Sequence, residues 1–465
     1  MAIVIAVVLL VVGSVLFHFL SPWQLTPLAS NWGNIDATLN LTLIVTGAVF
    51  VAVNLFMAWC IYRYRYDANR RSRYDPEDKR LEAWLTGLTT VGIAMLLAPG
   101  LLVWNAFVQV PEDHHTVEVV GAQWHWMFRY PGEDGELGRS DPRLISDANP
   151  FGIDPDDPAS QDDILIFTPR GYLPADRPVL LNLRARDVLH NFKVPNFRAK
   201  MDMVPGQVTQ MWLTPTRVGE FDLICAQLCG IGHFAMRGAV HVVDGNEFDE
   251  WLATQPTFAD LQALPAADPQ IGARHYASCI ACHGADGLGN QALNAPAIAG
   301  MEAWYTERQL QYFRDGVRGA HPEDEVGRQM VAFANILDAE ASRQVAAYIE
   351  SMEAAPAVAT VEGDAARGER VYRTCGGCHG RDGQGLLSTN APRLAGMDDW
   401  YQMRQLEHFQ RGVRGGHPDD MYGPQMRDMS RILVNDRAMR DVLAYINTLT
   451  GYENSIRPEL AKRDN

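Results

Sequence analysis

Three long apolar stretches near the start of the chain constrain its fold more than any other feature. They cover residues 2–20, 39–62 and 83–107, and each reaches the roughly 20 residues that a helix needs to cross a bilayer. After Asn105 the sequence becomes polar and acidic. The pattern therefore predicts a membrane-anchored N-terminal part followed by a large extramembrane part.

The loop between the second and third stretches predicts the orientation. Its basic residues are Arg63, Arg65, Arg70, Arg71, Arg73, Lys79 and Arg80. A short loop this basic stays on the cytoplasmic side, so we expect residues 38–110 to form a transmembrane helical hairpin with the rest of the chain outside the cytoplasm. The first stretch, within residues 1–37, lacks a basic leading segment, although Leu28-Ala29-Ser30 fits a signal-peptide cleavage site. A cleaved signal and a retained anchor both stay open, and the retained helix is favoured.

The extramembrane part changes character along the chain. The whole chain has 40 basic and 56 acidic residues and no long Lys/Arg run, so it does not resemble a nucleic-acid binder, which would need to neutralise phosphates. Residues 111–245 hold short β-rich runs between Pro, Gly and Asp turns, which predicts an antiparallel sandwich or barrel. Residues 246–268 are expected to form a linker with a short helix.

The C-terminal half is a duplication. The segment from Cys279 to Met330 recurs without a gap from Cys375 to Met426. We therefore expect two homologous all-α domains, joined by an Ala/Pro-rich linker and followed by a tail. The expected boundaries are 269–352, 353–364, 365–452 and 453–465.

Each copy begins with a Cys-x-x-Cys-His motif. The residues are Cys279, Cys282 and His283 in the first copy and Cys375, Cys378 and His379 in the second. The motif is typical of covalent c-type haem attachment, with the His as the proximal iron ligand. A disulfide or half of a zinc site is the alternative, but zinc would need further ligands at matching spacing in each copy.

The second axial ligand is expected downstream of each motif. Met330 and Met426 occupy equivalent positions, and a Met ligand would raise the reduction potential. His321 and His417 are also equivalent, and Met429 competes with Met426, so the sequence leaves these alternatives open.

A different metal motif lies in the β-rich part. Its residues are Cys225, Cys229, His233 and Met236, with His190 upstream. Thiolates with imidazole and thioether ligands select copper, and two cysteines indicate two coppers bridged by both sulfurs, with one His on each metal. The alternatives are a disulfide, a mononuclear copper site and a zinc site.

The surrounding motifs GAQWHWMFRYP, DVLHNFKVP, KMDMVPG and CAQLCGIGHFAM carry a family resemblance. From about residue 38 to 243 the chain resembles subunit II of haem–copper cytochrome c oxidases, and with its fused haem domains it resembles the caa3 type. The helical copies resemble class I cytochromes c, particularly the halves of dihaem c4-type cytochromes. The resemblance implies a multidomain fold: a transmembrane hairpin with an N-terminal helix, a cupredoxin-like β-sandwich and two all-α cytochrome c domains.

The resemblance also implies roles for individual residues. The binuclear copper centre CuA would be held by His190, Cys225, Cys229, His233, Met236 and the backbone carbonyl of Gln227. Trp124 matches the aromatic residue through which electrons reach CuA, and Glu82 matches the carboxylate at the mouth of the K proton pathway. Pro296 and Pro392 match the proline whose carbonyl accepts a hydrogen bond from the proximal His. The family usually has Glu at position 227, so we expect no normal Mg²⁺ ligand there.

The sequence thus predicts the electron-accepting subunit of a proton-pumping cytochrome c oxidase in a bacterial-type inner membrane. Two c haems and CuA would carry electrons from cytochrome c, or another periplasmic or membrane donor, to a separate catalytic subunit I, with subunit III alongside. Trp124 and Glu82 also each have a structural alternative. Trp124 would pack against its aromatic neighbours, and Glu82 would cap a helix. The functional alternatives are the small subunit of a CuA-containing nitric oxide reductase and a copper-delivery protein.

Overall fold

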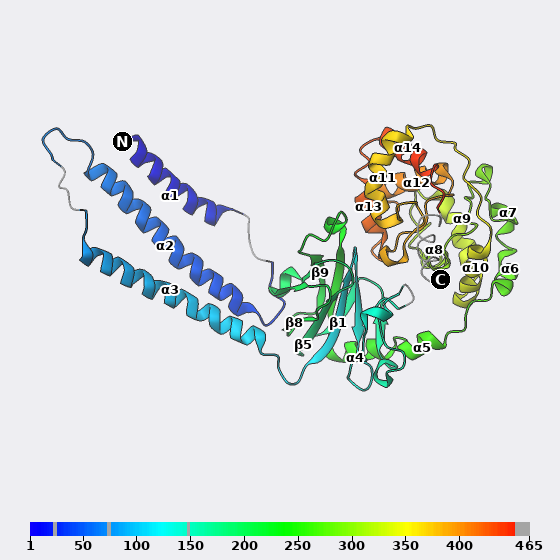
Figure 1. Ribbon diagram of the computed structural model, residues 1–465, viewed down its shortest axis with the longest axis horizontal. Helices are drawn as coiled ribbons and strands as arrows, with labels where there is room; N and C mark the ends of the chain where they lie inside the picture. Colours follow the sequence, from blue (N-terminus) through cyan, green and yellow to red (C-terminus); the bar gives the residue numbers. More distant parts are fainter. Residues whose placement is uncertain (22–25, 72–75, 147–148, 452–465) are drawn as a thin grey trace, which may run out of the picture.

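The structure, a computed structural model, describes residues 1–21, 26–71, 76–146 and 149–451. The expected tail, 453–465, and Arg73 lie outside the described residues. Figure 1 shows three parts in a row, with long helices at one end, a β-sandwich in the middle and a pair of helical domains at the other end.

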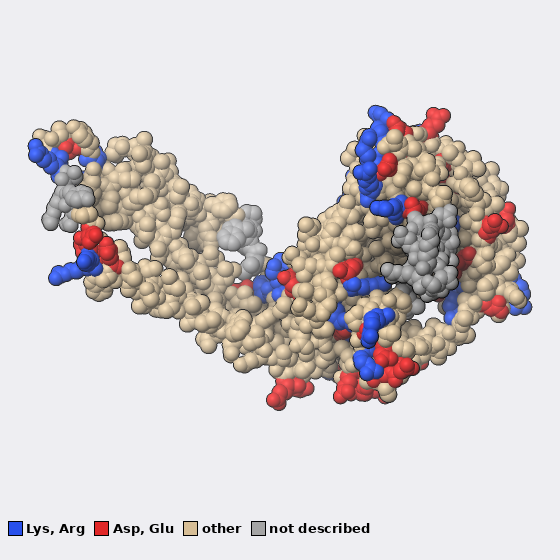
Figure 2. Space-filling model, in the orientation of Figure 1, with Lys and Arg blue, Asp and Glu red and all other residues tan. Residues whose placement is uncertain are grey.

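The N-terminal part is a bundle of three long helices, α1 (Ala2–Leu20), α2 (Gly33–Arg63) and α3 (Lys79–Val108). All three are long and apolar enough to cross a membrane. Their apolar side chains are largely exposed, which suits lipid rather than water as the surrounding medium. Figure 2 shows the charged side chains of this part concentrated at the end away from the sandwich.

The sandwich consists of two five-stranded sheets. Their strand orders are β3-β2-β1-β5-β8 and β4-β10-β9-β6-β7. The strands are β1 (His115–Ala122), β2 (His125–Tyr130), β3 (Ile164–Ile166), β4 (Arg170–Pro174), β5 (Val179–Ala185), β6 (His190–Lys193), β7 (Lys200–Met203), β8 (Thr209–Leu213), β9 (Gly219–Cys225) and β10 (Arg237–Val243). The expectation of antiparallel pairing was wrong in one respect, because β1 pairs with β5 and β10 with β4 in parallel. Parallel pairs join strands that are distant in sequence, and local patterns carry no information about them.

Apolar side chains from both sheets fill the sandwich, among them Trp126, Phe128 and Phe192. The segment expected to be a linker also contributes. It forms α4 (Gly245–Ala253) and α5 (Phe258–Ala263), and α4 buries Phe248 in this core. Most of the segment therefore belongs to the sandwich, because its spaced aromatic residues pack instead of facing solvent.

The helical domains follow. Helical domain 1 contains α6 (Pro269–Tyr276), α7 (Ile280–His283), α8 (Ala303–Arg314), α9 (Glu325–Ala334) and α10 (Ala339–Ser351). Helical domain 2 contains α11 (Ala365–His379), α12 (Asp399–Arg411), α13 (Gly423–Ser430) and α14 (Asp436–Ile446). In each domain the first and last helices pack together, α6 on α10 and α11 on α14.

Equivalent residues of the two copies form the contact between the helical domains. Arg308 of domain 1 donates to the side chain of Asn390 at 3.0 Å, and Arg404 of domain 2 donates to Asn294 at 2.9 Å. Because each pair is the image of the other in the repeat, the domains are related by a pseudo-twofold axis.

Candidate copper and haem sites

The ends of three strands and one loop bring the sulfur and imidazole ligands of the sandwich together. His190 begins β6 and Cys225 ends β9, and these two strands are paired. The loop from Cys225 to Met236, called the ligand loop below, holds the other three side chains and returns directly into β10. A hydrogen bond of 3.3 Å from the Cys225 N–H to the Met236 carbonyl closes the loop at its base.

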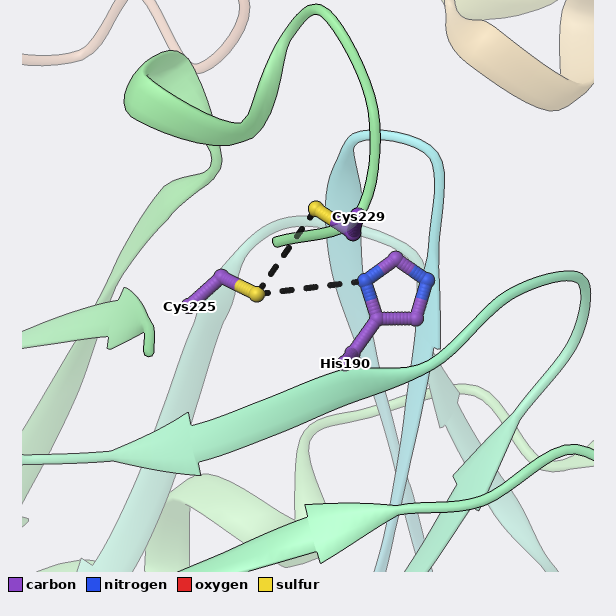
Figure 3. Close-up of side chains that lie close together, drawn as sticks. All are labelled: His190, Cys225 and Cys229. Carbon is purple, nitrogen blue, oxygen red and sulfur yellow. Dashed lines mark hydrogen bonds between the residues drawn. The ribbon is translucent and has the colours of Figure 1, made fainter. Parts of the chain in front are cut away.

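The two cysteines form the centre of this site. Their Sγ atoms lie 3.7 Å apart, much farther than the roughly 2.05 Å of a disulfide bond, so the disulfide alternative does not describe this geometry. Figure 3 shows His190 and both cysteines converging on one point. The three ligand atoms lie within 4.8 Å of one another and all three side chains are buried.

Each sulfur has its own imidazole. Cys225 Sγ lies 4.0 Å from His190 Nδ1, and Cys229 Sγ lies 3.5 Å from His233 Nδ1. Met236 Sδ is 3.7 Å from Cys229 Sγ. The Gln227 carbonyl oxygen lies 3.1 Å from Cys225 Sγ. The donor set fits two copper ions that share both sulfurs, with one His each.

A carboxylate orients His190. The Asp187 carboxylate can only accept a hydrogen bond, so His190 Nε2, 2.8 Å away, carries the proton and donates it. This leaves the Nδ1 lone pair facing the sulfurs, as a metal ligand requires. Burial alone would raise the pKa of Asp187, but hydrogen bonds from His190 and from the Gln123 N–H lower it.

The thiols are also coupled. A hydrogen bond from the Cys229 thiol lowers the pKa of Cys225. The resulting thiolate in turn raises the pKa of Cys229. The two sulfurs therefore disfavour each other's ionisation, and two thiolates need cations beside them.

Each helical domain contains a mostly apolar cavity beside its Cys-x-x-Cys-His motif. Cys279, Cys282, His283 and Met330 line the first. Cys375, Cys378, His379, Met426 and Met429 line the second. The two cavities adjoin, because Tyr305, Gln309, Met397, Tyr401 and Gln405 line both.

The motif histidines are oriented for iron. His283 Nδ1 lies 2.9 Å from the Pro296 carbonyl, and His379 Nδ1 lies 2.8 Å from the Pro392 carbonyl. A carbonyl only accepts, so Nδ1 carries the proton and Nε2 keeps its lone pair. Burial lowers the pKa of both histidines, which keeps them neutral. These cavities therefore fit a haem.

Methionines, and not the competing histidines, face the cavities. His321 and His417 lie in the loops before α9 and α13, where their Nδ1 atoms accept backbone N–H groups at 3.2 Å. In the part of the chain that the structure describes, neither of them lines a cavity. The choice between Met426 and Met429 stays open.

Trp124 lies between the ligand loop and helical domain 2. Its side chain is 5% exposed, and its Nε1–H donates to the Cys229 carbonyl at 3.0 Å. Helical domain 2 reaches it through Gln425, which donates to the Trp124 carbonyl at 2.9 Å. Cys378 packs against the sandwich core. Trp124, Trp126 and Phe128 all belong to that core, and Trp124 also takes part in the contact with helical domain 2.

Three further contacts hold helical domain 2 on the sandwich. The Tyr422 hydroxyl donates to the Phe167 carbonyl at 3.0 Å, and Arg170 pairs with Asp419 at 3.3 Å and donates to the Pro418 carbonyl. Sequence reasoning missed Gln425 and Tyr422, because they occupy ordinary positions in one of two similar repeats.

Glu82 lies in the first turn of α3, at the end of the hairpin away from the sandwich (Figure 1). The carboxylate that caps this helix is Asp78, which accepts the N–H groups of Arg80 and Leu81 at 3.0 Å. The capping alternative for Glu82 was therefore wrong, and its proton role remains a prediction.

Comparisons with known proteins show which families the chain resembles. The family described as "Cytochrome C oxidase subunit II, periplasmic domain" matches residues 115–243, and the family "Cytochrome c" matches residues 269–353 and 365–450. The alternative cytochrome c oxidase subunit 2 of Bradyrhizobium diazoefficiens is 52% identical over 266 residues, 57% of this chain and 96% of that protein. Cytochrome c oxidase subunit 2 of Cereibacter sphaeroides is 30% identical over 244 residues, 48% of this chain and 77% of that protein. Among solved structures, reduced cytochrome c4 from Pseudomonas stutzeri is 30% identical, with a TM-score of 0.33, covering 40% of this chain and 100% of that one.

The sandwich with its paired cysteines, the membrane-length helices and the two haem-type cavities all agree with this kinship. The chain is a membrane protein with a periplasmic domain, and it belongs to the cytochrome c oxidase subunit 2 family, as the electron-transport subunit of a haem–copper oxidase.

Proposed function

We propose that the chain carries a binuclear CuA centre and two covalently attached haem c groups, and passes electrons from an external donor to the catalytic subunit I that reduces O2. The observation that carries the proposal is the pairing of each ligand-loop sulfur with its own imidazole. Bound copper and haem accept and release single electrons, which protein side chains alone do not do.

The ligands proposed for copper are His190, Cys225, Gln227 through its carbonyl, Cys229, His233 and Met236. For the haems they are Cys279, Cys282, His283 and Met330, and Cys375, Cys378, His379 and Met426. The protein keeps these groups rigid: strands β6 and β9 fix the copper ligands, and the proline carbonyls fix the ring planes of the haem histidines. A rigid, buried site keeps its ligand positions when its charge changes, which favours rapid electron transfer.

The same proposal extends to topology. The basic loop at residues 63–80 would lie in the cytoplasm, and the sandwich and helical domains on the outer side of a bacterial-type inner membrane. Glu82 would then sit at the cytoplasmic end of α3, where a proton pathway into subunit I can begin. We also propose the domain boundaries given above, with α4 and α5 assigned to the sandwich.

The nitric oxide reductase alternative needs a different catalytic partner and is not better supported by the comparisons. The copper-delivery alternative leaves the haem cavities without a role. A protein that delivers copper to a partner would also need an accessible metal site, whereas the ligand loop here lies beneath helical domain 2.

The test is a comparison of two cysteine variants in the purified membrane complex. Cys225→Ser should lose copper and O2 uptake while keeping two covalent haems per chain. Cys60→Ser, which changes a cysteine of α2 outside the sandwich, should keep all three properties. Nitric oxide turnover with negligible O2 uptake in the unchanged complex would refute the oxidase assignment, and retention of copper by Cys225→Ser would refute the ligand assignment.

A further inference from the structure

The two helical domains are copies of one unit, but helical domain 2 covers the ligand loop. Helix α13 contacts the short 3-10 helix at 233–235 within that loop. In Figure 1, α13 lies on the side of the pair that faces the sandwich, and α7 of helical domain 1 lies on the opposite side. Helical domain 2 therefore contacts the proposed copper site directly, whereas helical domain 1 lies farther along the path to it.

The repeat shows which surface of helical domain 1 corresponds to that contact. Gly377, which lies over Trp124, corresponds to Ala281, and Gln425 corresponds to Gln329. Ala281 and Gln329 are both exposed. The surface that helical domain 2 uses against the sandwich is thus open in helical domain 1.

Apolar side chains surround this open surface. Ile280, Leu293, Phe333 and Ile336 are 43, 48, 36 and 69% exposed, and we call these four the domain 1 face. Leu293 and Phe333 also line the haem-type cavity, so the face is at the rim of the site that would hold the first haem. Single exposed apolar residues are common, but a group of them at the rim of a redox site is typical of an interaction surface.

The two helical domains also differ in charge. In helical domain 2, Arg residues outnumber Asp and Glu, whereas acidic residues outnumber basic ones in helical domain 1 and in the sandwich. The basic domain is the one that lies on the acidic sandwich. By the same complementarity, the acidic helical domain 1 suits a basic partner.

We propose that a small, basic one-electron carrier protein docks on the domain 1 face, and that helical domain 2 is the fixed internal donor to the copper site. Each docking event oxidises the carrier by one electron and reduces helical domain 1 by one electron, with no proton or group transferred. The electron then crosses to helical domain 2 and leaves near Cys378 and Trp124. This order rests on the proposed function, because it needs a haem in each domain.

The test compares exposed apolar residues of the two helical domains. Ile336 of helical domain 1 is 69% exposed, and Val434 of helical domain 2 is 82% exposed and does not line the second cavity. The complete oxidase complex carrying Ile336→Asp or Val434→Asp is mixed with reduced horse heart cytochrome c, a basic carrier, in a stopped-flow instrument. Binding of the redox-inactive zinc form of the same carrier is measured in parallel.

With Ile336→Asp, the second-order rate constant for carrier oxidation should fall by about tenfold, which corresponds to 1.4 kcal/mol, and binding of the zinc form should weaken in parallel. Val434→Asp should leave both unchanged. Equal effects, or a larger effect of Val434→Asp, would overturn the proposal. Reduction of both c haems by a small artificial reductant checks the proposed function separately: its failure in the unchanged complex would refute the haem assignment rather than the docking site.

Discussion

Substitution of Gly377 tests the contact between helical domain 2 and the ligand loop. A Cβ atom built at this position would lie 3.4 Å from both Trp124 Cη2 and Ile231 Cγ2, which is already van der Waals contact. Gly377→Ala should therefore be accommodated. The further carbons of Gly377→Leu have no space toward the sandwich, so one of the two surfaces must move.

The cost of this overpacking sets the expected magnitude. Extra methylene groups in a packed contact cost about 1–3 kcal/mol, which reduces the ratio of docked to undocked molecules by about 5- to 150-fold. The competing attraction is small: hydrogen bonds contribute about 0.5–1.5 kcal/mol each, and an exposed ion pair such as Arg170–Asp419 contributes about 0–1 kcal/mol. We therefore expect helical domain 2 to move away while the ligand loop keeps its shape.

Hydrogen–deuterium exchange on the full-length chain measures this change. Peptides from residues 226–236 should exchange faster in Gly377→Leu than in the unchanged chain or in Gly377→Ala. The matched control is Ala281→Leu, since Ala281 is the equivalent residue of helical domain 1 and is exposed. Unchanged exchange in Gly377→Leu, or equal acceleration in Ala281→Leu, would refute the docked arrangement.

Three further predictions concern single side chains. Trp124→Phe should retain full copper content, because Trp124 supplies no ligand, yet slow copper reduction after flash reduction of the c haems; normal kinetics would leave Trp124 a packing role only. Asp441→Asn should lower the melting temperature at pH 7, because Arg367 lowers the pKa of Asp441. A lowered carboxylate pKa stabilises the fold above the unfolded pKa and loses this effect as the pH falls through the folded value, so the two melting temperatures should converge in acid; a constant difference would contradict the ion-pair explanation. Of Met426→Leu and Met429→Leu, we expect only the first to lower the haem potential of helical domain 2 in a redox titration, and the reverse result would reassign the ligand.

Local sequence patterns account for how most of the candidate ligands come together. Cys225, Cys229 and His233 lie within one loop, and the haem motifs each lie within one short helical segment, so spacing alone brings these ligands together. His190 was found through its motif, and pairing of β6 with β9 brings it beside Cys225.

Features that depend on packing between segments far apart in the sequence could not be predicted in this way. The parallel strand pairs join segments that are far apart in sequence, and α4 is held by burial of Phe248 against strands that precede it. The role of Gln425 follows from the position of its whole domain. Its equivalent, Gln329, lies in the same Gly-x-Gln-Met pattern but is exposed.

Helical domain 2 is connected to the sandwich through helical domain 1, and this connection explains why few contacts hold it in place. A tethered partner has a higher effective concentration than a partner in solution, so a weak contact is sufficient to keep it docked. Hydrogen bonds from Gln425, Tyr422 and Arg170 and one ion pair match this requirement. A donor in solution has no such advantage and must be attracted by charge and apolar area, which the domain 1 face provides. Salt should consequently slow capture of the external carrier while leaving the transfer between helical domain 2 and the copper site nearly unchanged.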